Sequence, residues 1–234
     1  MTSVELNLDL DRTAVKTGEF DKQKWSLLQR WYPKININAE AELANQRKFY
    51  VKHGTMEYYD FSGHLRALGL PDKEVFERLS NSELADGRFE YEGLPELLDW
   101  AREHGTVQVL TFGEEPYQRL KSGLCPSLRD IEIITTMFPK GEFFMDRQPQ
   151  PEVQAWMVDD KPIGHELPWY VKFIQVTAEY NDVSPSARNE APWLTAVSLA
   201  AVLDKLKSAT DASQNASPEV AHRLREIPGL SMQR

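Results

Sequence analysis

The chain has 234 residues, of which 41% are hydrophobic and 27% are charged, and its formal net charge is −9 at pH 7. This length is enough for one sizeable hydrophobic core and a small second domain. The acidic balance and the lack of a long lysine and arginine cluster argue against nucleic-acid binding, since phosphate contacts dominate the affinity of such proteins.

The sequence also indicates a compartment. The single cysteine, Cys125, cannot form an internal disulfide. The first residues lack the basic segment and the apolar run of a signal peptide. No apolar run approaches the roughly 18 residues that a membrane-spanning helix needs. We therefore expect a cytoplasmic protein that does not bind a membrane.

The first predicted element is a β-strand at residues 4–10, where apolar and polar residues alternate. From residue 14 to residue 92 the apolar spacing is instead helical, and many aromatic residues occur there, which indicates a helical insertion with its own small core. The stretches with helical spacing are 24–32, 39–51, 56–68 and 73–84, and glycine or proline separates them.

After Gly93 the pattern alternates between helices and strands, which predicts a parallel sheet whose ligands bind at the carboxyl ends of the strands. From residue 208 the chain is rich in Ser, Ala, Asp, Asn and Gln, and we expect a flexible tail over 208–234. The predicted helices are 94–103, 114–122 and 193–206, and the predicted strands are 107–112, 131–136, 155–158 and 171–177.

Four polar features follow predicted strands, and a parallel sheet would bring them to one edge. The first is a pair of aspartates two residues apart, and the second is a threonine followed by phenylalanine and glycine. The third is a lysine in a loop, and the fourth is an adjacent acidic pair. In chain order these are Asp9 with Asp11, Thr111 with Phe112 and Gly113, Lys140, and Asp159 with Asp160.

These residue types suit phosphoryl transfer. The carboxylate of Asp9 could attack phosphorus and form an aspartyl phosphate. Asp11 lies two residues further along an extended chain, so its side chain points to the same side. It could protonate the leaving alcohol and then deprotonate the attacking water.

The carboxylates also predict a metal site. Asp9, Asp159 and Asp160 would repel one another, and a hard cation with oxygen ligands, most simply Mg²⁺, would relieve that repulsion. The backbone carbonyl of Asp11 could supply a further oxygen ligand.

The remaining features would bind the phosphate group. Lys140 would neutralise charge on the phosphoryl group and on Asp9. The hydroxyl of Thr111 and the backbone N–H groups of Phe112 and Gly113 could donate hydrogen bonds to phosphoryl oxygens.

In type and order, these features resemble the four motifs of the haloacid dehalogenase superfamily: Asp-x-Asp-x-Thr, then Thr or Ser, then Lys, then an acidic pair. The resemblance implies a Rossmann-like parallel sheet sandwiched by helices, formed by residues 1–13 and 93–207. It also implies a helical cap at 14–92 that closes over the site and selects the substrate. The dehalogenases of this superfamily lack the second aspartate and need no metal, so Asp11 favours phosphoryl transfer.

Three departures from the family pattern leave alternatives open. Lys140 is not followed by proline, and Lys121 is the alternative for the charge-neutralising lysine. Arg12 stands where many members have glycine, and it could contact substrate or point to solvent. Asp159 and Asp160 are adjacent, which leaves their division as metal ligands open.

The sequence thus predicts a magnesium-dependent phosphatase that hydrolyses a small phosphomonoester, such as a sugar phosphate or a nucleotide. The second hypothesis is a phosphomutase of the same family, which returns the phosphoryl group to a bound sugar. The third is a catalytically weak domain that binds a phosphorylated ligand or a protein. The sequence leaves the oligomeric state unknown.

Overall fold

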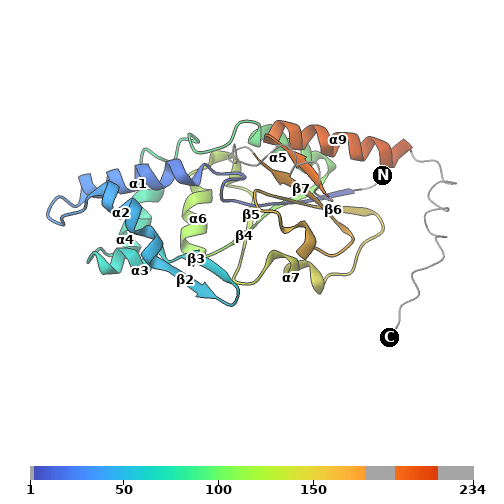
Figure 1. The fold of residues 1–234 in the computed structure, drawn as a ribbon. Helices are drawn as coiled ribbons and strands as arrows, with labels where there is room; N and C mark the ends of the chain where they lie inside the picture. The colour runs from blue at the N-terminus through green and yellow to red at the C-terminus, as the bar shows by residue number, and fades with distance from the viewer. Residues whose placement is uncertain (1–2, 178–192, 216–234) are drawn as a thin grey trace.

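The computed structural model describes residues 3–177 and 193–215 of the chain. Within them, six parallel strands form one sheet in the order β5-β4-β1-β6-β7-β8. Helices lie on both faces of the sheet (Figure 1), which confirms the predicted α/β class. The strands are β1 (Ser3–Leu8), β4 (Gly105–Phe112), β5 (Glu132–Thr136), β6 (Val153–Asp159), β7 (Val171–Val176) and β8 (Leu194–Ala196).

Strand β1 lies in the middle of the sheet, between β4 and β6. Its alternate residues Leu6 and Leu8 are fully buried, as the period-two pattern predicts. On the other face, the buried Asn7 donates a hydrogen bond to the carbonyl of Trp156 in β6, at 3.1 Å. Leu8 pairs with Val158 of β6, so the segments that follow these two strands leave the sheet side by side.

Alternation along the strands divides the apolar residues between two cores. Val109 and Val158 belong to the larger core, under two long helices, and Leu110 and Met157 belong to a smaller core with Phe144 on the opposite face. Figure 1 shows the two long helices together on one face and the short helix on the other. These helices are α5 (Leu94–His104), α9 (Leu199–Asn215) and, on the second face, α7 (Lys140–Met145).

The residues between β1 and α5, here called the cap (residues 14–92), extend away from the sheet (Figure 1). The helix α6 (Glu115–Gly123) follows β4 and packs against the cap helix α4 (Asp72–Ser80). It thereby connects the sheet to the cap. The described cap elements are α1 (Thr17–Trp31), α2 (Ala39–Asn45), β2 (Tyr50–His53), β3 (Met56–Tyr59), α3 (Phe61–Ala67) and α4 (Asp72–Ser80).

The helices predicted at 39–51 and 56–68 are wrong in part, because a β-hairpin occupies the end of the first range and the start of the second. Strands β2 and β3 pair antiparallel, from Tyr50 opposite Tyr59 to His53 opposite Met56. Gly54 begins the two-residue turn with φ +61°, a conformation that glycine adopts without steric cost. Paired tyrosines and a valine favour strands, and this local preference outweighs the apparent helical spacing.

The C-terminal prediction also needs correction. The expected helix at 193–206 is the short strand β8 followed by α9, which begins at Leu199. That helix continues to Asn215, through residues expected to begin a flexible tail. Leu206 and Thr210 are buried on the side of the helix that faces the core, and this burial stabilises the helix beyond residue 206. The rest of the expected tail, 216–234, lies outside the described residues.

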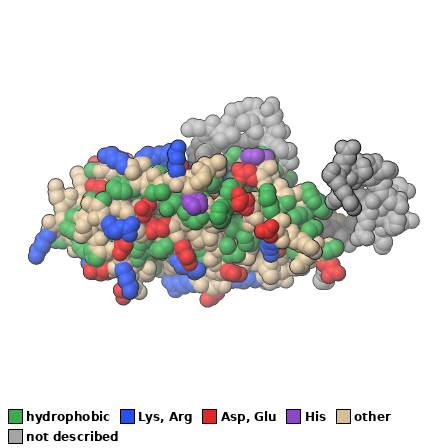
Figure 2. Space-filling view, turned by 90° about the horizontal axis from the view of Figure 1, so that it is seen from below, with side chains coloured by type: hydrophobic (Ala, Val, Ile, Leu, Met, Phe, Trp, Pro, Cys, Tyr) green, Lys and Arg blue, Asp and Glu red, His purple; other side chains and the backbone are tan. Residues whose placement is uncertain are grey.

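Charged side chains of both signs lie on the surface (Figure 2). On the face that Figure 2 shows, acidic and basic side chains are interspersed. Among the helices of the described residues, none has the length and apolar character needed to cross a membrane.

The first prediction concerns the register between β1 and β4. A Cβ atom added at Gly105 would lie 2.0 Å from the carbonyl oxygen of Val4. We therefore expect Gly105→Ala to lower the free energy of unfolding by about 1–3 kcal/mol, because the paired backbones would have to separate. Urea denaturation measures this change.

The matched control is Gly18→Ala in α1, where an added Cβ would meet no atom within 4 Å. We expect this variant to be neutral or stabilised by up to about 1 kcal/mol, since alanine favours helices over glycine. Equal stability of the two variants would contradict the close approach of β1 and β4 at Gly105.

Candidate active site

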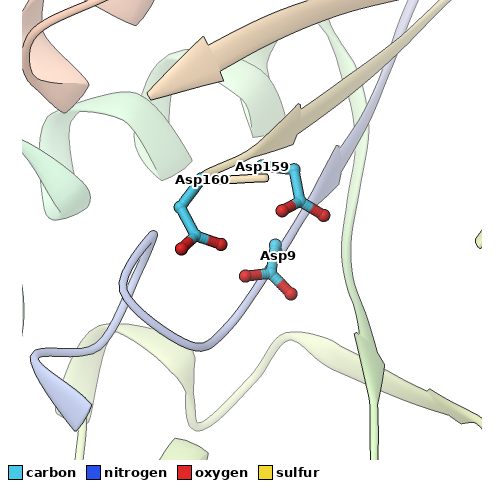
Figure 3. Close-up of side chains that lie close together, drawn as sticks. All are labelled: Asp9, Asp159 and Asp160. Carbon is cyan, nitrogen blue, oxygen red and sulfur yellow. The ribbon is translucent and has the colours of Figure 1, made fainter. Parts of the chain in front are cut away.

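Three aspartates gather at the carboxyl edge of the sheet. Asp9 directly follows β1, and its backbone N–H donates to the carbonyl of Val158 at 2.8 Å, which holds it beside the end of β6. Asp159 ends β6, and Asp160 follows it. One carboxylate oxygen from each of the three lies within 4.8 Å of the others. Figure 3 shows the three side chains grouped together where β1 and β6 end.

Burial makes this acidic cluster electrostatically unfavourable. Asp9, Asp159 and Asp160 are 5%, 1% and 3% exposed. Burial raises the pKa of Asp160 to about 8, and the charges of Asp9 and Asp159 add to the effect. Burial also raises the pKa of Asp9 to about 6, although Lys140 opposes the shift. The three carboxylates carry more negative charge than the one buried lysine beside them can balance, and all their ligand atoms are oxygens. These two properties fit a site for a divalent cation.

Lys140 supplies the nearest positive charge. It is the first residue of α7, and its ammonium group is buried against the Asp9 carboxylate. The same nitrogen lies 2.6 Å from Oδ2 of Asp159. Burial alone would lower the pKa of Lys140, but the two carboxylates outweigh it and raise the pKa above its usual value. Lys140 therefore remains a cation that bridges the first and fourth sequence features.

Asp11 lines the same pocket as the acidic cluster but has its own set of partners. Its carboxylate accepts a hydrogen bond from Lys121, with the hydroxyl of Thr17 at 2.5 Å and the amide of Gln118 at 3.2 Å. Burial would raise the pKa of Asp11, but Lys121 outweighs it, and the pKa falls to about 2. Lys121, the alternative charge-neutralising lysine, is thus placed at Asp11, whereas Lys140 is placed at Asp9.

Thr111 is the last buried residue of β4 and lines the same pocket. It is 1% exposed, and its hydroxyl has no hydrogen-bond partner among the described residues. A buried hydroxyl without a partner costs free energy, so this position is suited to a ligand that accepts a hydrogen bond.

The two residues after Thr111 are placed differently. Phe112 packs edge-on against Tyr58 of the cap hairpin, with the ring centroids 6.3 Å apart. The backbone N–H of Gly113 donates to the carbonyl of Thr136 at 3.3 Å. A phosphate contact through this N–H would require that bond to break.

The pocket above the acidic cluster has a volume of about 410 Å³. The cap hairpin supplies several residues of its wall, which the helices predicted for this segment do not indicate. Arg12 also lines the pocket, and its φ of +60° is unusual for a residue other than glycine. The cap residues in the wall include Arg47, Tyr50, Met56, Glu57 and Tyr58.

Direct contacts hold the cap against this edge of the sheet. The hydroxyl and backbone N–H of Ser62 both donate to the carboxylate of Glu114, which precedes α6. At the tip of the hairpin, His53 packs against Phe138, in the loop before Lys140, with ring centroids 5.8 Å apart. The cap therefore touches the loops that carry the second and third sequence features.

A scan of protein-family models gives no match to the sequence, and a search of curated proteins finds no significant relative. Solved structures are nevertheless similar. One described as a haloacid dehalogenase-like hydrolase, from Burkholderia xenovorans, has a TM-score of 0.61 at 15% identity, covering 93% of this chain and 100% of that chain. A HAD-hydrolase of Bacillus subtilis bound to magnesium has a TM-score of 0.50 at 15% identity, with 88% and 99% covered.

A third similar structure is a dehalogenase with an intermediate complex, with a TM-score of 0.50 at 16% identity, covering 86% of this chain and 96% of that chain. These similarities confirm, at the level of the fold, the resemblance indicated by the four motifs. The chain has the haloacid dehalogenase-like fold, and its acidic cluster lies where that fold brings the strand ends together.

The raised pKa of Asp160 predicts a pH dependence of stability without metal. The folded protein keeps a proton on Asp160 up to about pH 8, whereas an unfolded chain releases it near the ordinary value of 3.8. The folded state binds more protons in this range, so its stability should fall as the pH rises from 3.8 to about 8. Urea denaturation in EDTA at several pH values measures the decline, and Asp160→Asn should reduce it.

Adding Mg²⁺ at the upper end of this range should restore stability in the wild type, because an ion held by the three carboxylates would bind the folded state and not the unfolded chain. Asp160→Asn should show a smaller gain. The control is Asp99→Asn in α5, where the aspartate side chain is 72% exposed. An undiminished pH dependence in Asp160→Asn, or an equal Mg²⁺ effect in both variants, would contradict the assignment of a buried metal cluster.

Proposed function

We propose that this chain is a magnesium-dependent phosphatase that hydrolyses a small phosphomonoester through an aspartyl phosphate on Asp9. The observation that carries the proposal is the convergence of three carboxylates within one ion's reach beside the ammonium group of Lys140. The hydroxyl of Thr111, which has no hydrogen-bond partner within residues 3–177 and 193–215, adds a donor for a phosphoryl oxygen at the same pocket. The magnesium-bound structure of similar fold supports the choice of ion.

Asp9 is oriented for nucleophilic attack. The hydroxyl of Thr13 donates to its Oδ2 at 3.2 Å, and Lys140 pairs with its Oδ1. A carboxylate oxygen of Asp9 forms the new bond to phosphorus, and the bond from phosphorus to the ester oxygen breaks with its electron pair on the leaving alcohol. Water then attacks phosphorus, which releases phosphate and regenerates the Asp9 carboxylate.

The charge of the phosphoryl group has defined partners. Lys140 neutralises charge on Asp9 and on the phosphoryl oxygens, and Thr111 donates a hydrogen bond to one of them. The backbone N–H of Phe112 and, after release from Thr136, that of Gly113 complete the donor set. A magnesium ion held by Asp9, Asp159, Asp160 and the carbonyl of Asp11 would supply further positive charge at these oxygens.

Asp11 acts as the general acid and general base. Its carboxylate is kept ionised by Lys121, which is the form that deprotonates the attacking water. Asp11 takes one proton from the attacking water in each turnover and delivers it to the leaving alcohol of the next, so the proton balances over the cycle. Asp11 and Lys121 both line the pocket, so Lys121 can hold Asp11 there in both steps.

The main test is a phosphatase assay of the wild type beside Asp9→Asn, with p-nitrophenyl phosphate and a panel of sugar phosphates and nucleotides in Mg²⁺. The substitution keeps the shape of the side chain but removes the charge of the attacking oxygen, so activity should fall below a few per cent of the wild type. Malachite-green detection of phosphate measures the rate, and circular dichroism checks the fold.

Other outcomes would reject the proposal. Rates in Asp9→Asn comparable to wild type would exclude Asp9 as nucleophile. Turnover that depends on a bisphosphate activator would indicate a phosphomutase. Halide release from 2-chloropropionate without phosphate release would indicate a dehalogenase. No activity in a folded protein across the whole panel would favour a binding domain.

A second test separates the proton-transfer role. Asp11→Asn should slow hydrolysis of phenyl phosphate by about 100-fold or more, because phenolate needs protonation to leave. The loss should be smaller for p-nitrophenyl phosphate, whose leaving group is a weaker base. Steady-state kcat values for both esters measure the difference, and equal losses would rule out Asp11 as the general acid.

A further inference from the structure

Oppositely charged side chains lie in a buried row between the first cap helix and Asp11. Asp21 and Lys24 lie on α1, and Tyr117 and Lys121 lie on α6. Lys24, Tyr117 and Lys121 are 0%, 4% and 2% exposed. The spacings of three and four residues put each pair on one side of its helix, so that α1 and α6 face each other through these groups.

At the cap end, Lys24 is fixed by polar and aromatic contacts. Its ammonium group donates to Oδ1 of Asp21 and to the hydroxyl of Tyr117, and that hydroxyl donates to the same Asp21 oxygen at 2.6 Å. The ammonium nitrogen also lies 4.6 Å from the centroid of the Tyr117 ring and 4.7 Å from that of Phe61. These contacts replace the water that a buried ammonium group loses.

At the Asp11 end, Lys121 is fixed in a comparable way. Its ammonium nitrogen lies 4.7 Å from the centroid of the same Tyr117 ring and donates to Oδ1 of Asp11. Thr17, at the start of α1, contacts that carboxylate oxygen too. Both ends of the row therefore depend on α1, through Thr17 at Asp11 and through Asp21 at Tyr117.

We propose that Lys121 is a positioning residue that holds the Asp11 carboxylate toward α6, and that Tyr117 ties this lysine to the cap through Asp21 and Lys24. This inference rests on the proposed function, because it concerns the group assigned to proton transfer. Among the described residues, the ion pair of Lys121 is with Asp11, whereas Asp9 and Asp159 pair with Lys140, so we expect Lys121 to act on the reaction through Asp11. The cap thereby sets the orientation of a catalytic group as well as covering the pocket.

The test is a double-mutant cycle with Lys121→Met, Asp11→Asn and the double variant, assayed with phenyl phosphate and p-nitrophenyl phosphate. Lys121→Met should lower kcat for phenyl phosphate by about tenfold or more and for p-nitrophenyl phosphate by less, because it disturbs the proton-transfer group. KM should change little. In the Asp11→Asn background, removing Lys121 should cause no further loss.

Controls separate positioning from general structural damage. Arg119→Met, on an exposed side of α6 where the arginine side chain is 58% exposed, should leave both rates unchanged. Lys121→Arg keeps a cation and should recover part of the lost rate. Tyr117→Phe removes only the link to Asp21 and Lys24 and should give a smaller loss that again disappears in Asp11→Asn. An equal loss with and without Asp11 would overturn the proposal.

Crystal structures of the wild type and Lys121→Met give a readout that does not depend on activity. Without the lysine, the Asp11 side chain should leave its place beside α6, and an unmoved carboxylate would overturn the positioning role. If the wild type hydrolyses no phosphate ester, the proposed function fails, and the structures alone decide whether Lys121 orients Asp11. Should Lys121→Met not fold, the same comparison with Tyr117→Phe decides it.

Discussion

Three buried carboxylates around one ammonium group form the electrostatic constraint on which the rest of this site depends. Asp9, Asp159 and Asp160 cannot all be ionised at low cost, because Lys140 pairs with Asp9 and Asp159 only. Such an arrangement is unfavourable for folding alone, and sites of this kind are retained for what they bind or catalyse. A divalent cation and a phosphoryl group together would satisfy the groups that the protein leaves uncompensated, including the hydroxyl of Thr111.

The parallel sheet produces this concentration of charge without any local strain at the three aspartates. Because β1 and β6 are adjacent and in register, residues directly after the two strands emerge side by side. The apolar residues Leu8 and Val158 are buried at the last paired position, so the register is fixed by the core rather than by the charges. The stability of the sheet thus offsets the cost of bringing the carboxylates together.

The cap contributes to the site in two physically different ways. The hairpin supplies aromatic and charged wall residues, and its Tyr58 packs on Phe112 next to the partnerless Thr111. The first cap helix instead reaches Asp11 through Thr17, and it reaches Tyr117 through Asp21. Phe112 therefore has a packing role against the cap.

The sequence by itself determined the parallel α/β sheet and the positions of the polar residues at its edge, because strand period and strand ends are local properties that the order of residues displays. Lys140 could be chosen from its place after a strand, but its contact with Asp9 and the contact of Lys121 with Asp11 required the packed helices. The cap hairpin was missed because its short strands mimic helical spacing, and its pairing depends on a turn at Gly54 and on contacts with the core. Only the tertiary structure decided which charges face one another, since the contacts of Lys121 with Asp11 and of Lys140 with Asp9 join residues more than 100 positions apart.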